Sequence, residues 1–343
     1  MGQERVLNFF DVLLIITKKR GASNMKNIKY SIRGQPPMRI VLTGLVPCTA
    51  VSIYLFGWRA FALVLFCCLV AYLIELVFET HRGGAPTESL FVSGALLGLS
   101  LPPYTPFWVA AVGTMVGMTF GKQVFGGFGK NVFNPAIVGR CFLYVCFPIE
   151  MTSRWMIPAS EPFGRILQWS NFDAITSATP LITFKQTGTL PDLWSLVVGS
   201  VSGSMGETSA IAVLIGGVYI VYKKVADWRY PLSTILGAMA VNVPLYLCGV
   251  QGVMEPVHSL FSGSLLFGAF FMVTEPVSGC VKKEAKWAYG FLIGALWVFI
   301  RSFSGFPEAT AFAILLGNTF GPLLDEAAMT WEKMKQKKAL TEA

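Results

Sequence analysis

The sequence predicts an all-α polytopic membrane protein of about ten transmembrane helices, built as two inverted repeats of five helices. Composition is the first observation behind this prediction. Of the 343 residues, 54% are hydrophobic and 13% are charged, which is about half the charged fraction of an average soluble protein. Long apolar runs between short polar loops are the second observation, and they lack the period-two alternation of a transmembrane barrel. Short matches between the two halves of the chain are the third.

Ten apolar runs give the predicted spans. In chain order they are 39–57, 60–78, 88–101, 106–120, 134–149, 208–222, 231–249, 258–274, 287–302 and 309–325. The first repeat covers 39–149 and the second covers 208–326. Residues 1–38 are expected to carry an amphipathic helix on the membrane surface, and they show no small-residue cleavage site of a signal peptide. The loop 150–207 joins the repeats, and 327–343 form a tail.

The distribution of basic residues orients the spans, because cytoplasmic loops are enriched in lysine and arginine. With both termini inside, most of the 27 basic residues fall in inside loops, tails or inner span ends. The outside segments and span ends hold Arg59, Arg154, Arg165, Lys185 and Arg301. The loop 150–207 is then extracytoplasmic. Topology also accounts for the net charge of +8, so nucleic acid is not an expected partner.

Two sequence matches share one offset and indicate a duplication. WR at 58–59 recurs at 228–229, and SGALL at 93–97 recurs as SGSLL at 262–266. Because five spans are an odd number, the second copy enters the membrane from the opposite side. The repeated segments are short or end at prolines. The helix over 89–101 would reach about 20 Å across a hydrocarbon core of about 30 Å. Such interrupted segments mark the binding site in inverted-repeat transporters.

Ionisable residues within spans are functional candidates, because a charge at membrane depth is costly. Glu75, Glu88 and Glu275 are the candidates for an ion pathway, although Glu75 could also snorkel to the inner surface. Arg140 is expected to pair with a carboxylate or with an anionic cofactor. Glu207 starts the sixth span, and we expect it to cap that helix.

The chain shows no metal-binding pattern. Its seven cysteines lie mostly in apolar runs and form no CxxC pair, and its two histidines, His81 and His258, stand apart. We therefore expect no metal or iron–sulfur site within this chain alone. It also shows no nucleotide-binding fold, so it is not expected to oxidise NADH by itself.

The polar stretch DAITSATPL, residues 173–181, lies in the predicted outside loop. Thr179 offers a hydroxyl for a phosphodiester bond, Ala178 leaves room for a modifying enzyme, and Asp173 is expected to position the segment. Pro180 keeps the residue before it out of the helical conformation, which places the Thr179 hydroxyl on extended backbone. From these residues alone, an ordinary Ser/Thr turn in a polar loop is the favoured interpretation.

Residues 126–135 form a glycine-rich inside loop without the GK[ST] sequence or the βα context of a phosphate-binding loop. Asn131 and Asn134 can donate and accept hydrogen bonds to a planar polar ring. A tight loop whose glycines take unusual backbone angles is the alternative.

Several long motifs, in order, resemble the RnfD/NqrB family of membrane subunits of ion-pumping redox complexes. They are FGWRAFALVL (56–65), SGALLGLSLPP (93–103), GKQVFGGFGKNVFNPAIVGR (121–140), DAITSATPL (173–181), GETSAIAVLIGG (206–217) and TEPVS (274–278). The short lead into the first span and the FGWRA and DAITSATPL motifs favour RnfD, whereas GKNVFNPAIVGR is closer to NqrB. The resemblance covers nearly the whole chain.

The resemblance implies two flavins. Family members carry FMN joined through its phosphate to a threonine in a D-x-x-[S/T]-G-A-T pattern. Here Asp173 and Thr176 match that pattern, Ser177 stands in place of the glycine, and Ala178 and Thr179 complete it. Thr179 is therefore the expected acceptor. A non-covalent riboflavin near the inside face is implied for Asn131 and Asn134, and Glu88 matches a family glutamate linked to the cation pathway.

These implications predict a subunit of an ion-translocating ferredoxin:NAD oxidoreductase in the bacterial cytoplasmic membrane, coupled to Na⁺ or H⁺ and not catalytic alone. Its expected partners are the other members of the complex, a flavin transferase and membrane lipid. Two alternatives remain open. One is an NqrB-type subunit of a Na⁺-translocating NADH:quinone reductase. The other is a channel or transporter on the same scaffold without a redox role, which should purify without flavin.

Overall fold

The computed structural model describes residues 32–159, 164, 169, 178–304 and 309–342. Over these ranges the protein is helical and forms no β-strand, apart from isolated bridges such as the one between Arg33 and Thr87. The predicted all-α class is therefore confirmed. The surface helix expected within residues 1–38 falls largely outside the described part of the chain.

The first half contains the helices of the first five predicted spans. They are α2 (Pro36–Phe56), α3 (Trp58–Arg82), α4 (Ser89–Leu99), α5 (Phe107–Met118) with its π-helical end η2 (Thr119–Gln123), and α6 (Pro135–Cys146). Glycine punctuates this run, since Gly57 (φ 83°) separates α2 from α3 and Gly83 ends α3 in the left-handed conformation. Asn134 caps α6, because its side chain accepts a hydrogen bond of 3.0 Å from the Ala136 N–H.

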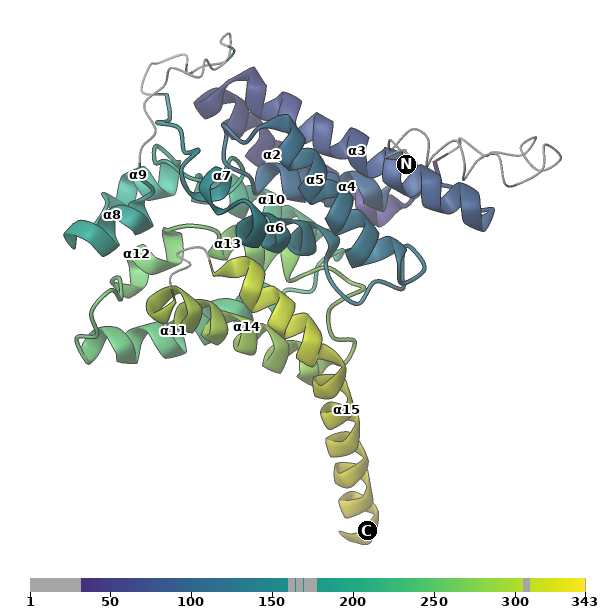
Figure 1. Cartoon of the computed structure of the whole chain (residues 1–343). Helices are drawn as coiled ribbons and strands as arrows, with labels where there is room; N and C mark the ends of the chain where they lie inside the picture. Colours follow the sequence, from purple (N-terminus) through teal and green to yellow (C-terminus); the bar gives the residue numbers. More distant parts are fainter. Residues whose placement is uncertain (1–31, 160–163, 165–168, 170–177, 305–308, 343) are drawn as a thin grey trace, which may run out of the picture.

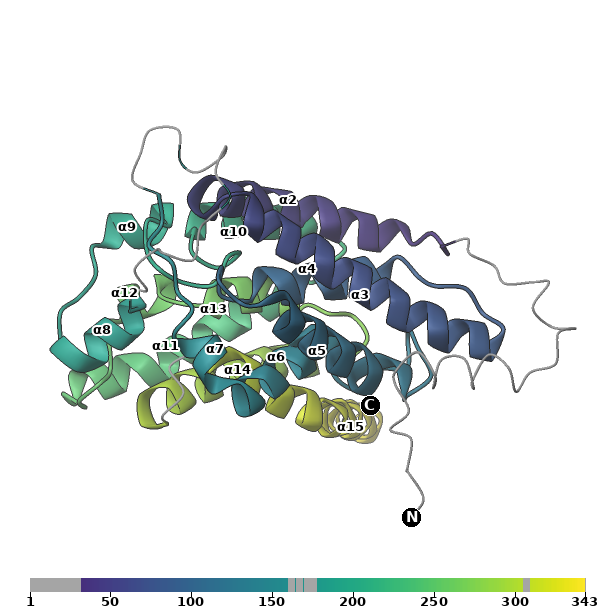
Figure 2. The same ribbon diagram turned by 45° about the horizontal axis from the view of Figure 1, so that its top comes forward.

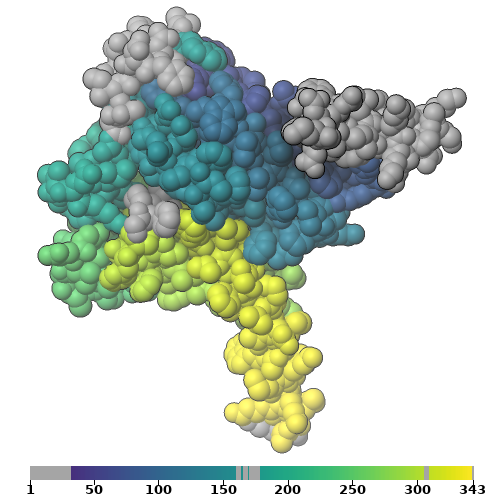
Figure 3. All heavy atoms as spheres, in the orientation of Figure 1, coloured from purple at the N-terminus to yellow at the C-terminus, as the bar shows by residue number. Residues whose placement is uncertain are grey.

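Short helices connect the halves, and the second half follows. The connecting helices are α7 (Pro148–Thr152), α8 (Pro180–Thr187) and α9 (Leu193–Val198). The second half consists of α10 (Ala210–Tyr222), α11 (Arg229–Leu247), α12 (Pro256–Phe261), α13 (Leu265–Phe267) with η3 (Gly268–Met272), α14 (Lys283–Phe303) and α15 (Thr310–Glu342). The eighth predicted span is thus broken between α12 and α13, where Gly263 has a φ of 72°. Residues 327–342 continue α15 as helix, and this part protrudes from the body (Figure 3).

Among the residues that the structure describes, three helices are long and apolar enough to cross a membrane by length and composition, namely α2, α3 and α11. The helices α4, α6 and α10 are apolar but shorter. These features fit a membrane protein. The number of ten spans and the inverted repeat remain predictions.

Helices that hold the same place in the order of each half pack against each other. The first helices, α2 and α10, pack together, and so do the last, α6 and α15 (Figures 1 and 2). Gly44 on α2 and Gly216 on α10 allow a close crossing, because a Cβ added to Gly216 would collide with the carbonyl oxygen of Gly44. Two halves related by a two-fold axis would make contacts of this kind.

Each half also ties its second helix to the loop that follows its short third segment. In the first half, Arg59 at the start of α3 donates to the carbonyl oxygens of Pro103 and Thr105, the latter at 2.9 Å. In the second half, Tyr230 at the start of α11 donates to the Cys280 carbonyl oxygen at 2.6 Å. The third segments themselves begin alike, as PTESLF at 86–91 and PVHSLF at 256–261.

Candidate functional site

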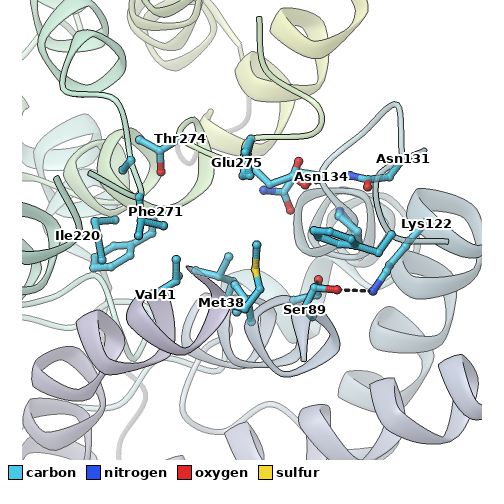
Figure 4. Close-up of a pocket in the computed structure, with 18 residues that line it drawn as sticks. Met38, Val41, Ser89, Lys122, Asn131, Asn134, Ile220, Phe271, Thr274 and Glu275 are labelled. Atoms are coloured by element: carbon cyan, nitrogen blue, oxygen red, sulfur yellow. Dashed lines mark hydrogen bonds between the residues drawn. The ribbon is translucent and has the colours of Figure 1, made fainter. Parts of the chain in front are cut away.

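A cavity lies between the two halves of the chain. Figure 4 shows Lys122 and Ser89 on one side, Ile220 and Phe271 on the other, and Met38 beneath. Its walls come from both halves and are mostly apolar, with polar groups gathered at one end. A planar ring with polar edges fits such a lining, because apolar walls hold its faces and a few polar groups fix its orientation.

Glu75 is held inside the protein and does not snorkel. Its Oε2 lies 2.6 Å from Lys122 Nζ, and the two side chains are 1% and 2% exposed. Its Oε1 accepts hydrogen bonds from the Thr87 N–H at 2.9 Å and from the Thr87 hydroxyl at 2.6 Å. Lys122 also donates to Ser89 Oγ at 2.7 Å and faces the cavity. Glu75 therefore influences the cavity indirectly, because it fixes Lys122, which lines the cavity.

Asn131 and Asn134 both line the cavity, as the expected riboflavin site requires, but their amide N–H groups already bond the second half. Asn131 Nδ2 donates to Glu275 Oε1 at 2.9 Å, and Asn134 Nδ2 donates to the Met272 carbonyl oxygen at 3.2 Å. Glu275 is further held by the Ser278 hydroxyl. The structure thus brings three of the predicted site residues together, and it joins the halves through them.

Glu88 lies apart from that cluster. Its carboxylate accepts from the Gln35 N–H at the start of α2 and pairs with Arg39 at 2.7 Å, and the Arg39 side chain is 67% exposed. An acidic side chain at this helix start satisfies an orphan backbone donor. Glu88 therefore anchors α2 to the start of α4.

Thr179 lines a second cavity at the start of α8. Its backbone is extended, with φ −69° and ψ 156°, and its Oγ1 accepts from the Ile182 N–H at 3.4 Å. The residue is only 4% exposed, so it borders this cavity and is not open to solvent. Ala178 is exposed beside it, whereas Asp173, Thr176 and Ser177 lie outside the described residues.

Arg140 and Glu207 form a buried ion pair at this second cavity. Arg140 Nη1 bonds Glu207 Oε1, and its Nη2 donates to Ser204 Oγ at 3.2 Å. The prediction that Arg140 pairs with a carboxylate is met by Glu207. The prediction that Glu207 caps α10 is wrong, because Ser209 is the N-cap and accepts from the Ala212 N–H at 3.4 Å.

The two cavities lie at opposite ends of α10. Ile220, near its C-terminal end, lines the first, whereas Thr208, just before its first residue, lines the second. The rise between these residues along a helix is about 18 Å.

Sequence reasoning missed Lys122 and Thr208 as site residues. In the sequence, Lys122 serves only the topology argument, although a lysine at an apolar helix end is itself a signal. Thr208 lies in the GETSAIAVLIGG motif, but nothing there distinguishes it from its neighbours, and only the fold places it at the same cavity as Thr179.

Comparison with known proteins covers nearly the whole chain. Residues 26–332 match the model of a family described as the NQR2, RnfD, RnfE family. The D subunit of the ion-translocating oxidoreductase complex of Alcanivorax borkumensis is 35% identical over 306 residues, which are 84% of this chain and 89% of that protein. The D subunit of the Na⁺-translocating ferredoxin:NAD⁺ oxidoreductase complex of Acetobacterium woodii is 35% identical, over 84% and 87% of the two chains.

A relative from a second type of complex is equally similar over a shorter stretch. The B subunit of the Na⁺-translocating NADH–quinone reductase of Pseudoalteromonas atlantica is 36% identical over 256 residues. The match covers 73% of this chain and 62% of that protein.

Proposed function

The chain belongs to the NQR2, RnfD, RnfE family, and from this membership we propose that it is the D-type membrane subunit of an ion-translocating ferredoxin:NAD oxidoreductase, an Rnf complex. The observation that carries the proposal is the match to proteins named as D subunits over most of both chains. The B-type membrane protein of a NADH–quinone reductase is the second candidate, and the Pseudoalteromonas relative favours it.

Thr179 is the proposed attachment point of FMN. Its hydroxyl oxygen would form an ester bond to the flavin phosphate, and a flavin transferase would supply that phosphate from a flavin dinucleotide. The phosphoanhydride bond of the donor breaks, the adenosine monophosphate half leaves, FMN stays on the threonine oxygen, and the hydroxyl proton is released. The extended backbone at Thr179 and the cavity that this residue lines support this role. Because Thr179 is 4% exposed, the transferase would have to act while Thr179 is more accessible than it is in this structure.

The cavity between the halves is the proposed riboflavin site. Its apolar walls and its polar end formed by Asn131, Lys122 and Glu275 support this assignment. The side-chain oxygen of Asn131 is available as an acceptor for a ring N–H, whereas its amide donates to Glu275. Asn134 shapes the wall as the cap of α6.

Electron transfer and ion movement would meet in this protein. The bound flavins would carry the electrons, while the protein binds and orients them and sets their electrostatic environment. Glu75 and Glu275 are the proposed ion-pathway residues at the inner cavity, and both are within one polar cluster with Lys122. Glu88, the third candidate, has its structural partner in Arg39. The transported ion would be Na⁺ or H⁺.

The protein would reside in the bacterial cytoplasmic membrane with both termini in the cytoplasm and Thr179 on the outer side. The lysine and arginine distribution of the sequence supports this orientation. Other members of the complex, a flavin transferase and lipid are the proposed partners. The chain would not be catalytic alone.

Assays of the purified complex in sealed vesicles test the assignment. Reduced ferredoxin with NAD⁺ should drive ion uptake, whereas NADH with a quinone should not. Uptake with NADH and quinone only would assign the chain to the NADH–quinone reductase type. A flavin-free preparation inactive with either pair would reject both assignments.

A further inference from the structure

An unsatisfied hydroxyl, that of Thr208, lies at the cavity that Thr179 lines. Thr208 is 5% exposed, and its Oγ1 is buried without a hydrogen-bond partner among the residues that the structure describes. It lines the same cavity as Thr179. A buried hydroxyl without a partner is costly, because it has lost its hydrogen bonds to water. Such a group is therefore a candidate ligand contact.

The wall around Thr208 suits an anion despite its carboxylate. Glu207 faces the cavity, but its charge is neutralised by the bond to Arg140, which also donates to Ser204. Arg140 is 1% exposed, so this pair is fixed in place. The pair holds the segment that carries Ser204 and Thr208 against α6.

Two helices begin at this cavity. Thr179 is the N-cap of α8, and Thr208 directly precedes Ser209, the N-cap of α10. Helix N-termini present free backbone N–H groups and a partial positive charge, and both features favour a phosphate group. The unsatisfied Thr208 hydroxyl adds a side-chain donor at the same place.

We infer that Thr208 donates a hydrogen bond to the phosphodiester of the flavin on Thr179, and that Arg140 and Glu207 position the wall that carries it. The inference rests on the proposed attachment of FMN to Thr179. Thr208 is then the anchor of the phosphate, and Arg140 and Glu207 are positioning residues.

An adjoining cavity could hold the part of the flavin beyond the phosphate. It shares Pro180, Val201 and Ser202 with the cavity that Thr179 and Thr208 line. Ala178, Leu190 and Pro191 make its other walls largely apolar. With the phosphate at Thr208, the ribityl chain would pass Ser202 and reach this apolar surface.

Hydrogen–deuterium exchange of peptides from 201–209 tests the inference on the purified full chain. The wild-type chain is prepared with and without a flavin transferase, and intact mass establishes whether one FMN is attached. Attachment should slow exchange in this segment about tenfold, the factor that one hydrogen bond to a charged group supplies. Equal exchange in the modified and unmodified chains would overturn the inference, even if the variants below fail to fold.

Two substitutions at Thr208 separate its hydroxyl from its shape. Thr208→Val should lose most of the protection, whereas Thr208→Ser, which retains a hydroxyl, should keep it. Thr114→Val, at an equally buried threonine on α5, is the control and should also keep it. Full protection in modified Thr208→Val would reject the role of Thr208 while leaving FMN attachment intact. A wild-type chain without an attached FMN would instead reject the proposed function, and this inference with it.

Discussion

Lys122 on η2 and Glu75 on α3 form a buried ion pair. Lys122 Nζ lies 2.6 Å from Glu75 Oε2, with side chains 2% and 1% exposed. Ser89 and Thr87 complete the hydrogen bonding of the two charged groups. Removing one member of such a pair leaves the other charge buried and uncompensated. The polar end of the cavity between the halves therefore depends on both residues.

Single substitution of either member should destabilise the protein strongly. Glu75→Gln or Lys122→Met should each lower the free energy of unfolding by about 3–5 kcal/mol. The double variant should lose less than the sum of the two, because it leaves no charge unpaired. Unfolding of the detergent-solubilised wild type, both single variants and the double variant gives the four free energies to compare. Strictly additive losses would show that the two residues do not interact.

Asn131 should control riboflavin content. Asn131→Leu removes the acceptor that faces the cavity and also the bond to Glu275, so the purified complex should contain at least about tenfold less riboflavin per chain. Extraction and chromatography measure it. Asn242→Leu removes an equally buried amide next to a different cavity and should leave the content unchanged. A normal content in Asn131→Leu would place riboflavin elsewhere.

The crossing of α2 and α10 should not accept a side chain at Gly216. A methyl group there meets the carbonyl oxygen of Gly44, so Gly216→Ala should cost about 1–3 kcal/mol of stability through overpacking. Gly34→Ala is the control, because the nearest atom to its added Cβ is the end of the flexible Arg39 side chain. Equal thermal stability of the two variants would contradict the close crossing.

The three acidic candidates should separate in an ion-transport assay. Glu275→Gln and Glu75→Gln should lower the number of ions moved per electron. Both residues bond polar side chains that line the cavity between the halves, Glu275 to Asn131 and Glu75 to Lys122. Glu88→Gln should change this ratio little, since Glu88 bonds the start of α2 and an exposed arginine. Ion uptake and NADH formation measured on the same vesicles give the ratio. A Glu88→Gln variant with the lowest ratio of the three would reverse this order.

Hydropathy was sufficient to predict where the helices lie, because apolar runs and their proline and glycine boundaries are local properties. Each of the ten predicted spans contains helix in the structure. The break in the eighth predicted span was not predicted, because the sequence SGSLL is typical of a continuous helix. In the structure, Gly263 has a φ of 72° and interrupts it. Local patterns also failed at Glu207, whose partner Arg140 lies 67 positions away.

The motifs point to some site residues but not to what these residues contact. Asn131, Asn134 and Thr179, which the motifs single out, each line a cavity. Lys122 and Thr208 lie in motifs too, but the residues around them come from distant segments, and one sequence does not show such contacts. The same limit explains Glu88, whose partner Arg39 is reached only through the packing of α2.

The proposed function depends above all on the flavin on Thr179, which in-gel fluorescence of the denatured chain detects. The chain is expressed with a flavin transferase as wild type, as Thr179→Ala and as Thr187→Ala, an exposed control on the same helix that lines neither cavity. We expect fluorescent bands for wild type and Thr187→Ala and a dark band for Thr179→Ala. A dark wild-type band, with the transferase active on another substrate, would show that Thr179 carries no flavin and would contradict the redox role.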